Sequence, residues 1–132
     1  MRIGFVLLSW SSNKSMKLSP KIIENIYSML YCVEPFASWD LPLPEEIKFI
    51  VDSDPDAMGT YLYDDGETHA HVITISDARC GHLDTVIRTM AHEMIHASRW
   101  NTVTHAWTKH DKTFRNHAKA VANELGFDPL EL

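Results

Sequence analysis

The sequence has few cysteines, which excludes a domain held together by disulfides or by cysteine-bound zinc. Only Cys32 and Cys80 occur in 132 residues, far apart and outside any CxxC pair. Disulfide scaffolds and zinc knuckles need several closely spaced cysteines. This usage favours a reducing compartment. We therefore expect a cytoplasmic protein, in a bacterial cell or, if the chain is viral, in the host cytoplasm.

Long hydrophobic runs and a basic charge are also missing. No apolar stretch is long enough to span a bilayer, so no membrane association is expected. The opening MRIGFVLLSW has only a short apolar run and no A-x-A site, which favours a buried strand or helix start over a signal peptide. The formal net charge of −6 argues against an autonomous nucleic-acid binder. Without repeats or linkers, the length predicts one domain over residues 1–132.

Hydrophobic periodicity predicts three helices. Residues 18–33 place apolar side chains at helical spacing, with Ser19 as a cap. A second helix is expected to begin at Leu83, with Asp84 as its cap, and a third to cover residues 111–125 and stop at Gly126. The side chains expected to face the core are Leu83, Val86, Ile87, Met90, Met94 and Ala97 in the second helix, and Phe114, Ala118, Val121 and Leu125 in the third.

Two β-prone segments complete the pattern. Residues 46–52 predict a short strand, and residues 59–76 a hairpin with Asp65-Gly66 at its turn. The second strand of this hairpin is expected to place four alternate side chains on one face, His69, His71, Ile73 and Ile75. Local antiparallel strands with helices on either side predict the α+β class, with a small antiparallel sheet.

The segment TMAHEMIHASRW, residues 89–100, contains a His-Glu-x-x-His motif. Residues four apart share one face of a helix, so His92 and His96 could direct ring nitrogens at one metal ion. Glu93 lies about a hundred degrees round the helix from His92, which suits a general base for a water that the metal activates. The motif predicts a catalytic site with one zinc ion per chain and three protein ligands. A chance occurrence on an amphipathic helix is the alternative.

The third ligand is expected downstream of His96. Arg99 and Thr102 stand where a metzincin has glycine and histidine, so that subclass is excluded. The remaining candidates are His105, His110, His117 and Glu124. His110 stands at the start of the last helix, which is a rigid mounting, and His105 lies in the preceding loop. His117 shares the face of His110 and is expected to be packed in the core or behind the ligands.

The sequence resembles the SprT-like metallopeptidases, a family that includes the Spartan proteases. IRTMAHEMIHA followed by TKHDKTF is similar to the family's HExxH helix, its loop and its His-Gly-x-x-Phe, with His110 and Phe114 at the matching positions. FASWDLPLPEEIKFIV, MGTY and ITIS resemble the elements before that helix. The likeness covers about residues 20–127. It implies a zincin-like fold with a core of about 19–127, peptidase activity and His110 as third zinc ligand. Asp111 stands where the family has glycine.

The predicted function is that of a zinc-dependent metalloendopeptidase that acts on a protein or peptide, whose chain would add as a strand beside HVITIS. A transition-state donor could come from Tyr61, Tyr63, His69 or His71, and the substrate pocket could be lined by Trp100 and Trp107. Two alternatives stay open. The zinc protein could be a binding or inhibitory module with little proteolysis. It could also associate weakly with DNA through Lys109, Lys112, Arg115 and Lys119, which otherwise form a solvated helix face.

Overall fold

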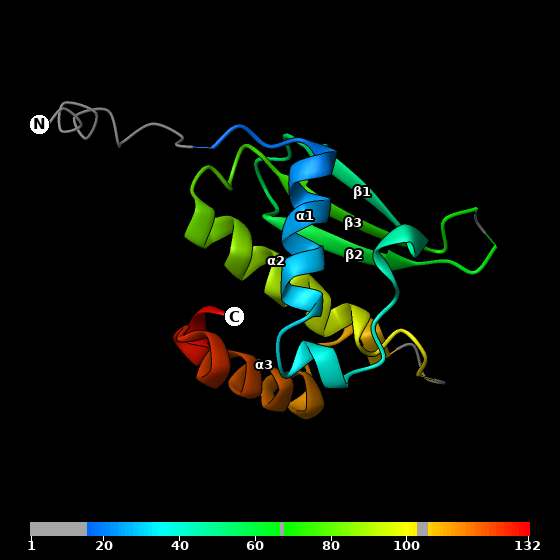
Figure 1. The fold of residues 1–132 in the computed structure, drawn as a ribbon, viewed down its shortest axis with the longest axis vertical. Coiled ribbons are helices and arrows are strands. Elements are labelled where there is room, and N and C mark those ends of the chain that lie inside the picture. Colours follow the sequence, from blue (N-terminus) through cyan, green and yellow to red (C-terminus); the bar gives the residue numbers. More distant parts are fainter. Residues whose placement is uncertain (1–15, 67, 103–105) are drawn as a thin grey trace, which may run out of the picture.

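Three α-helices pack on one side of three β-strands in the computed structural model, which describes residues 16–66, 68–102 and 106–132 (Figure 1). The predicted α+β class is confirmed, and the segment MRIGFVLLSW lies outside the described residues. Their order along the chain is α1 (Pro20–Tyr31), β1 (Ile47–Asp52), β2 (Gly59–Tyr63), β3 (His71–Ser76), α2 (Leu83–Ala97) and α3 (Lys112–Leu125).

One predicted helix cap and one predicted helix end are confirmed. The Ser19 hydroxyl accepts a hydrogen bond of 3.2 Å from the backbone N–H of Ile22 at the start of α1. α3 ends at Gly126, which has a φ of 84° in the left-handed region that favours glycine. Asp84 was predicted to cap α2, and this is wrong. The helix begins at Leu83 as expected, but it follows His82 without a side-chain capping bond, so Asp84 lies inside the first turn. There its charge still favours the helix N-terminus.

The sheet is mixed, which corrects the prediction of an antiparallel sheet. Its strand order is β1-β3-β2. β2 and β3 form the predicted antiparallel pair, whereas β1 runs parallel to β3. The reason is that the chain leaves β1, forms β2 at the far edge and returns through the hairpin to place β3 in the middle. β3 therefore has both sides occupied, so the predicted addition of a substrate strand beside HVITIS is wrong, and the strand edge that faces α2 belongs to β2 (Figure 1).

The hairpin connection is longer than a two-residue turn. It spans residues 64–70 and closes with a bond of 2.8 Å from the Asp64 N–H to the Ala70 carbonyl. His69 lies in this exposed connection, outside β3. The face shared in the strand is consequently that of His71, Ile73 and Ile75, all of which are buried.

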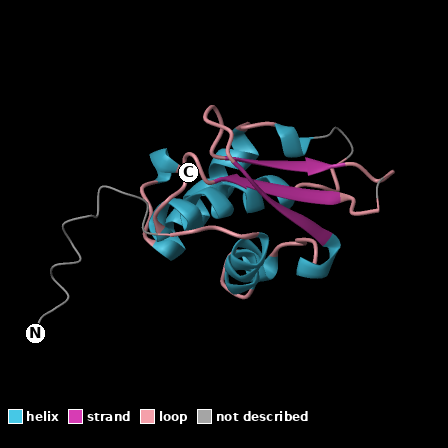
Figure 2. Cartoon of the chain, turned by 90° about the horizontal axis from the view of Figure 1, so that it is seen from above, coloured by secondary structure: helices cyan, strands magenta, loops and turns pink. Residues whose placement is uncertain are grey.

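The helices pack in layers over one face of the sheet. α1 and α2 contact this face and each other, and α3 lies along α2 on the side away from the sheet (Figures 1 and 2). Gly59 lets β2 approach α2, because a Cβ there would stand 2.9 Å from the Thr74 carbonyl oxygen and 3.0 Å from Thr89 Cγ2. The edge strand β2 is thereby held close to the helix with the His-Glu-x-x-His motif.

The predicted apolar stripes are largely buried. Leu83 is 53% exposed and borders a surface groove with two half-buried members of the stripes, Ile87 and Leu125. None of the helices in the described ranges has the length and apolar character that crossing a membrane requires. The predicted inward residues that are buried are Val86, Met90, Met94, Ala97, Phe114, Ala118 and Val121.

Candidate metal centre

The first two histidines of the site project from the middle of α2. His92 and His96 are one helical turn apart, with ring centres separated by 5.0 Å. The turn is held rigidly because Met90, Met94 and Ile95 on the same helix are fully buried in the core. Core packing of α2 thus determines where both imidazoles point.

His110, just before α3, completes the group. Its Nε2 lies 3.0 Å from Nε2 of His96, and one ring nitrogen from each of the three histidines falls within 4.8 Å of the others. Nitrogen ligands about 2.05 Å from one tetrahedral zinc ion are about 3.3 Å apart. Within the described residues this is the one group of three potential ligands that could hold a metal ion.

The other candidates for the third ligand lie elsewhere or cannot be placed. His117 stacks on Trp39, with ring centres 4.3 Å apart, and belongs to the packing behind α3. Its buried Nδ1 has no hydrogen-bond partner within the described residues. Glu124 is exposed near the far end of α3 and is not part of the histidine group. His105 lies outside the described residues.

The protonation state of the α2 histidines suits metal binding. Burial lowers the pKa of His96 to about 4 and lowers that of His92 as well, so both rings are neutral near pH 7. Nδ1 of His96 donates a hydrogen bond of 2.7 Å to the Trp107 carbonyl. That bond leaves the lone pair on Nε2, the atom that faces His110.

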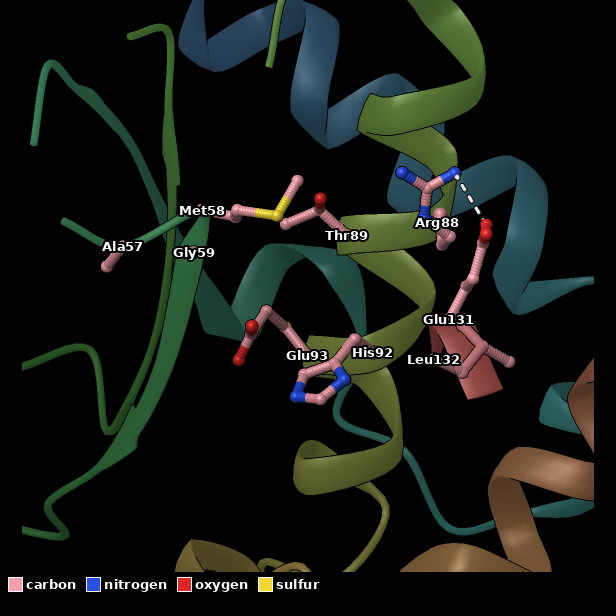
Figure 3. A pocket seen from close by; sticks show the side chains of 9 residues that line it. All are labelled: Ala57, Met58, Gly59, Arg88, Thr89, His92, Glu93, Glu131 and Leu132. Atoms are coloured by element: carbon pink, nitrogen blue, oxygen red, sulfur yellow. Dashed lines mark ion pairs between the residues drawn. The ribbon is translucent and has the colours of Figure 1, made fainter. Parts of the chain in front are cut away.

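Glu93 occupies a buried position beside the histidines. Its exposed fraction is 5%, and Figure 3 shows its side chain leaving α2 toward Gly59 of β2. Burial raises the pKa of this carboxyl to about 8, so in the absence of a nearby cation the group is protonated at neutral pH. A divalent cation held by the histidines would favour the carboxylate again. Burial and a bound cation would therefore shift the pKa of Glu93 in opposite directions.

An ion pair connects the end of α2 to the start of α3. Arg99 is 9% exposed and donates two hydrogen bonds, of 2.6 and 3.0 Å, to the two carboxylate oxygens of Asp111. Asp111 also accepts a bond of 3.0 Å from the Phe114 N–H and so caps α3. The hydrogen bond from Arg99 is the main cause that lowers the pKa of Asp111 to about 2. The residue after His110 is thus held from both sides, with a φ of −82° that needs no glycine.

A cleft of about 350 Å³ lies between the edge strand β2 and the histidines. Trp107 lines it as predicted, whereas Trp100 packs on Tyr63 and His71 and donates to the Asp40 carbonyl. The residues that line the cleft are Gly59, Thr60, Tyr61, Leu62, His92, Glu93, His96, Trp107, Thr108 and His110.

Tyr61 is the one predicted transition-state donor whose side chain borders this cleft. Its hydroxyl shares a hydrogen bond of 2.7 Å with Nδ1 of His71, and burial raises its pKa far above the usual range. Burial also lowers the pKa of His71, so the pair is neutral. We conclude that this hydroxyl is committed to the core of the sheet.

Three contacts around the histidines could not be predicted from local sequence patterns. The Trp107 carbonyl is a backbone atom, and any residue there could supply it. Arg99 pairs with Asp111, twelve positions further along the chain, and the local sequence around Asp111 predicts only a helix cap. Leu132 supplies a backbone hydrogen bond to His92 from a segment with no motif.

The fold and the histidine group define a small α+β domain with a potential metal site on an HExxH helix. Comparison with protein families agrees with this class. The model of the SprT-like family matches residues 44–130, and the chain belongs to the SprT-like family. Comparisons with curated proteins and with solved structures found no similar protein.

Proposed function

We propose that the chain is a zinc-dependent metalloendopeptidase of the SprT-like family. The observation that carries this proposal is the placement of Glu93 at the same cleft as the three histidines, below the edge of β2. A site that only stabilised the fold would have no use for a buried carboxyl next to its ligands, because burying such a group is costly.

The ligands in this proposal are His92, His96 and His110. The neutral imidazoles of His92 and His96 and the spacing of the three rings suit a zinc ion, which when bound would act as a Lewis acid on a water molecule and on the scissile carbonyl. The hydrogen bond to the Trp107 carbonyl keeps Nε2 of His96 free to serve as ligand.

Glu93 is the general base and then the general acid. Its carboxylate takes a proton from the attacking water and passes it to the leaving amine. Burial, which raises the pKa of this carboxyl, opposes the lowering that a bound cation would cause, and so favours proton transfer in both directions.

The edge strand β2 is the proposed guide for the substrate. A polypeptide segment in extended conformation can pair with a free strand edge, and residues 59–62 of β2 line the cleft above the histidines. Because Gly59 packs tightly on Thr89, the distance between this strand edge and the helix that carries Glu93 is fixed.

Glu93→Gln tests the proposal. The variant should keep one zinc ion per chain by elemental analysis and lose about 10²–10⁴-fold in peptide hydrolysis. Glu124→Gln, which changes an exposed glutamate of α3, is the matched control and should leave both quantities unchanged. A zinc-loaded wild type that binds peptides without cleaving them would instead support the binding or inhibitory module.

DNA association through Lys109, Lys112, Arg115 and Lys119 is a further candidate role. All four side chains are exposed, but the net charge of −6 opposes contact with a polyanion. We expect at most weak binding that falls steeply with salt. The predicted cytoplasmic location stays a prediction.

A further inference from the structure

A second pocket opens beside the histidines, between α3 and the turn of residues 129–131. Its volume is about 380 Å³, within the range of small-ligand pockets. It shares His92 and His110 with the cleft below β2, so the two hollows meet at two of the three histidines. A polypeptide that lay along β2 would bring some of its side chains within reach of this pocket.

The lining of this pocket is apolar with two cations. Arg115 and Lys119 are its charged residues, and they lie one turn apart on α3. No acidic side chain is among its lining residues within the described part of the chain. Glu131 of the adjoining turn lines a different pocket, where its carboxylate lies 3.7 Å from Arg88 (Figure 3). The apolar lining consists of Phe114, Ala118, Pro129, Leu130 and Leu132.

We infer that this pocket receives an acidic side chain of the polypeptide that occupies the cleft. A glutamate matches both parts of the lining, since its methylene groups suit Phe114 and Leu130 and its carboxylate suits the two cations. The inference deepens the proposed function, because it rests on a polypeptide passing over the histidines, and it names acidic segments as the substrate class.

The two cations are not equivalent. Arg115 already donates a hydrogen bond of 3.0 Å to the His110 carbonyl, so its replacement would also disturb a metal ligand. Lys119 makes no hydrogen bond or ion pair with the described residues and is exposed at the pocket. Lys119 is therefore the residue whose charge can be changed without altering the metal centre.

A polypeptide fits this pocket better than a nucleic acid does. Phosphate recognition uses several cations along a backbone, whereas here two cations stand over an apolar lining. Lys112 distinguishes the two ligands. It lies on α3 two turns before Lys119 and is exposed, but it does not line the pocket. A DNA backbone following α3 would depend on both lysines, and an acidic side chain in the pocket on Lys119 alone.

The test is binding of labelled peptides to zinc-loaded Glu93→Gln, which separates recognition from hydrolysis. Ten-residue peptides of alanine and serine carry one glutamate, glutamine or lysine, moved along the sequence in steps. At one position we expect glutamate to bind about threefold to tenfold more tightly than glutamine, as for a partly exposed charge pair. Adding Lys119→Glu should abolish this preference and favour lysine, whereas Lys112→Glu, with the same change of charge, should retain it.

Equal binding of the glutamate and glutamine peptides at every position would overturn the inference. So would an equal loss of the preference in Lys119→Glu and Lys112→Glu, or displacement of the peptide by a short duplex DNA whose affinity falls equally in both variants. If zinc-loaded wild type hydrolyses no peptide while the Lys119-dependent preference holds, the peptidase function fails and the acidic pocket stands. If it hydrolyses peptides without that preference, the pocket fails and the peptidase function stands.

Discussion

The two halves of the metal centre are held by different forces. His92, Glu93 and His96 are part of a helix whose core-facing side chains are fully buried, so packing of the whole domain sets their positions. His110 is exposed and depends on its neighbour Asp111, which is fixed by Arg99 and by the α3 cap. Damage to the packed half on α2 should therefore lower the stability of the domain. Damage around His110 should lower metal affinity without that loss of stability.

Removing one ligand from each half gives the largest effect. We expect His96→Ala and His110→Ala both to abolish zinc binding in elemental analysis. Their metal-free forms should differ, because only His96→Ala leaves the Trp107 carbonyl without its donor, which costs about 1–3 kcal/mol. His110→Ala should unfold in urea within about 0.5 kcal/mol of wild type. Equal destabilisation by the two changes would contradict the division into halves.

Breaking the ion pair behind His110 comes next. Arg99→Gln should weaken zinc affinity about 10–100-fold, as expected for a group that orients a ligand, while circular dichroism stays that of the folded protein. Competition with a chelating dye measures the affinity. Asp111→Asn should act similarly, because asparagine still caps a helix but lacks the charge.

Arg88→Gln is the matched control for this experiment. It breaks the longer ion pair between Arg88 of α2 and Glu131 of the C-terminal turn, and should change zinc affinity less than about twofold, as a partly exposed pair contributes little. If Arg99→Gln behaves like this control, His110 does not depend on the pair.

Gly59→Ala acts on the packed half. The new methyl group would press on the Thr74 carbonyl and on Thr89, and we expect a loss of about 1–3 kcal/mol in urea unfolding. Zinc affinity should persist, because β2 supplies no ligand. Gly66→Ala, in the exposed hairpin connection, is the control and should have little effect. Unchanged stability in Gly59→Ala would show that β2 can move away from α2 freely.

Tyr61→Phe should have the smallest effect. It removes the hydrogen bond to His71 and is expected to cost about 1 kcal/mol of stability. Peptide hydrolysis should fall by less than about tenfold, since loss of a true transition-state donor costs about 10²–10³-fold. Measuring kcat and KM on the variant distinguishes these outcomes. A hundredfold loss of kcat at normal stability would mean that the hydroxyl turns toward the substrate.

Short-range patterns made much of this molecule predictable, and long-range ones did not. The spacing of His92 and His96, the Ser19 cap and the stop at Gly126 depend on contacts within one or two turns, and the structure agrees with each. The central position of β3 depends on which strands pair with one another. The alternation of apolar and polar residues within one strand does not specify its partners.

The position of His110 shows the same limit inside the site. Its place at the start of α3 and its match to the family motif identified it among the candidates, and the structure brings it to the α2 histidines. The contacts that hold it there come from Arg99, which pairs with the adjacent Asp111, and from Arg115, which donates to the His110 carbonyl; they lie on opposite sides of His110 along the chain. Such pairings are properties of the folded state, where distant polar groups must find partners once they are buried.

The Arg99–Asp111 pair also has a consequence for chain entropy. It joins the two ends of the connection between α2 and α3, so the residues between them form a closed loop. Lengthening such a loop twofold adds only about 0.6 kcal/mol to the cost of closing it. The connection can therefore accept inserted residues while His110 stays in register with His92 and His96. The ion pair makes the geometry of the site largely independent of the length of the segment that joins its two halves.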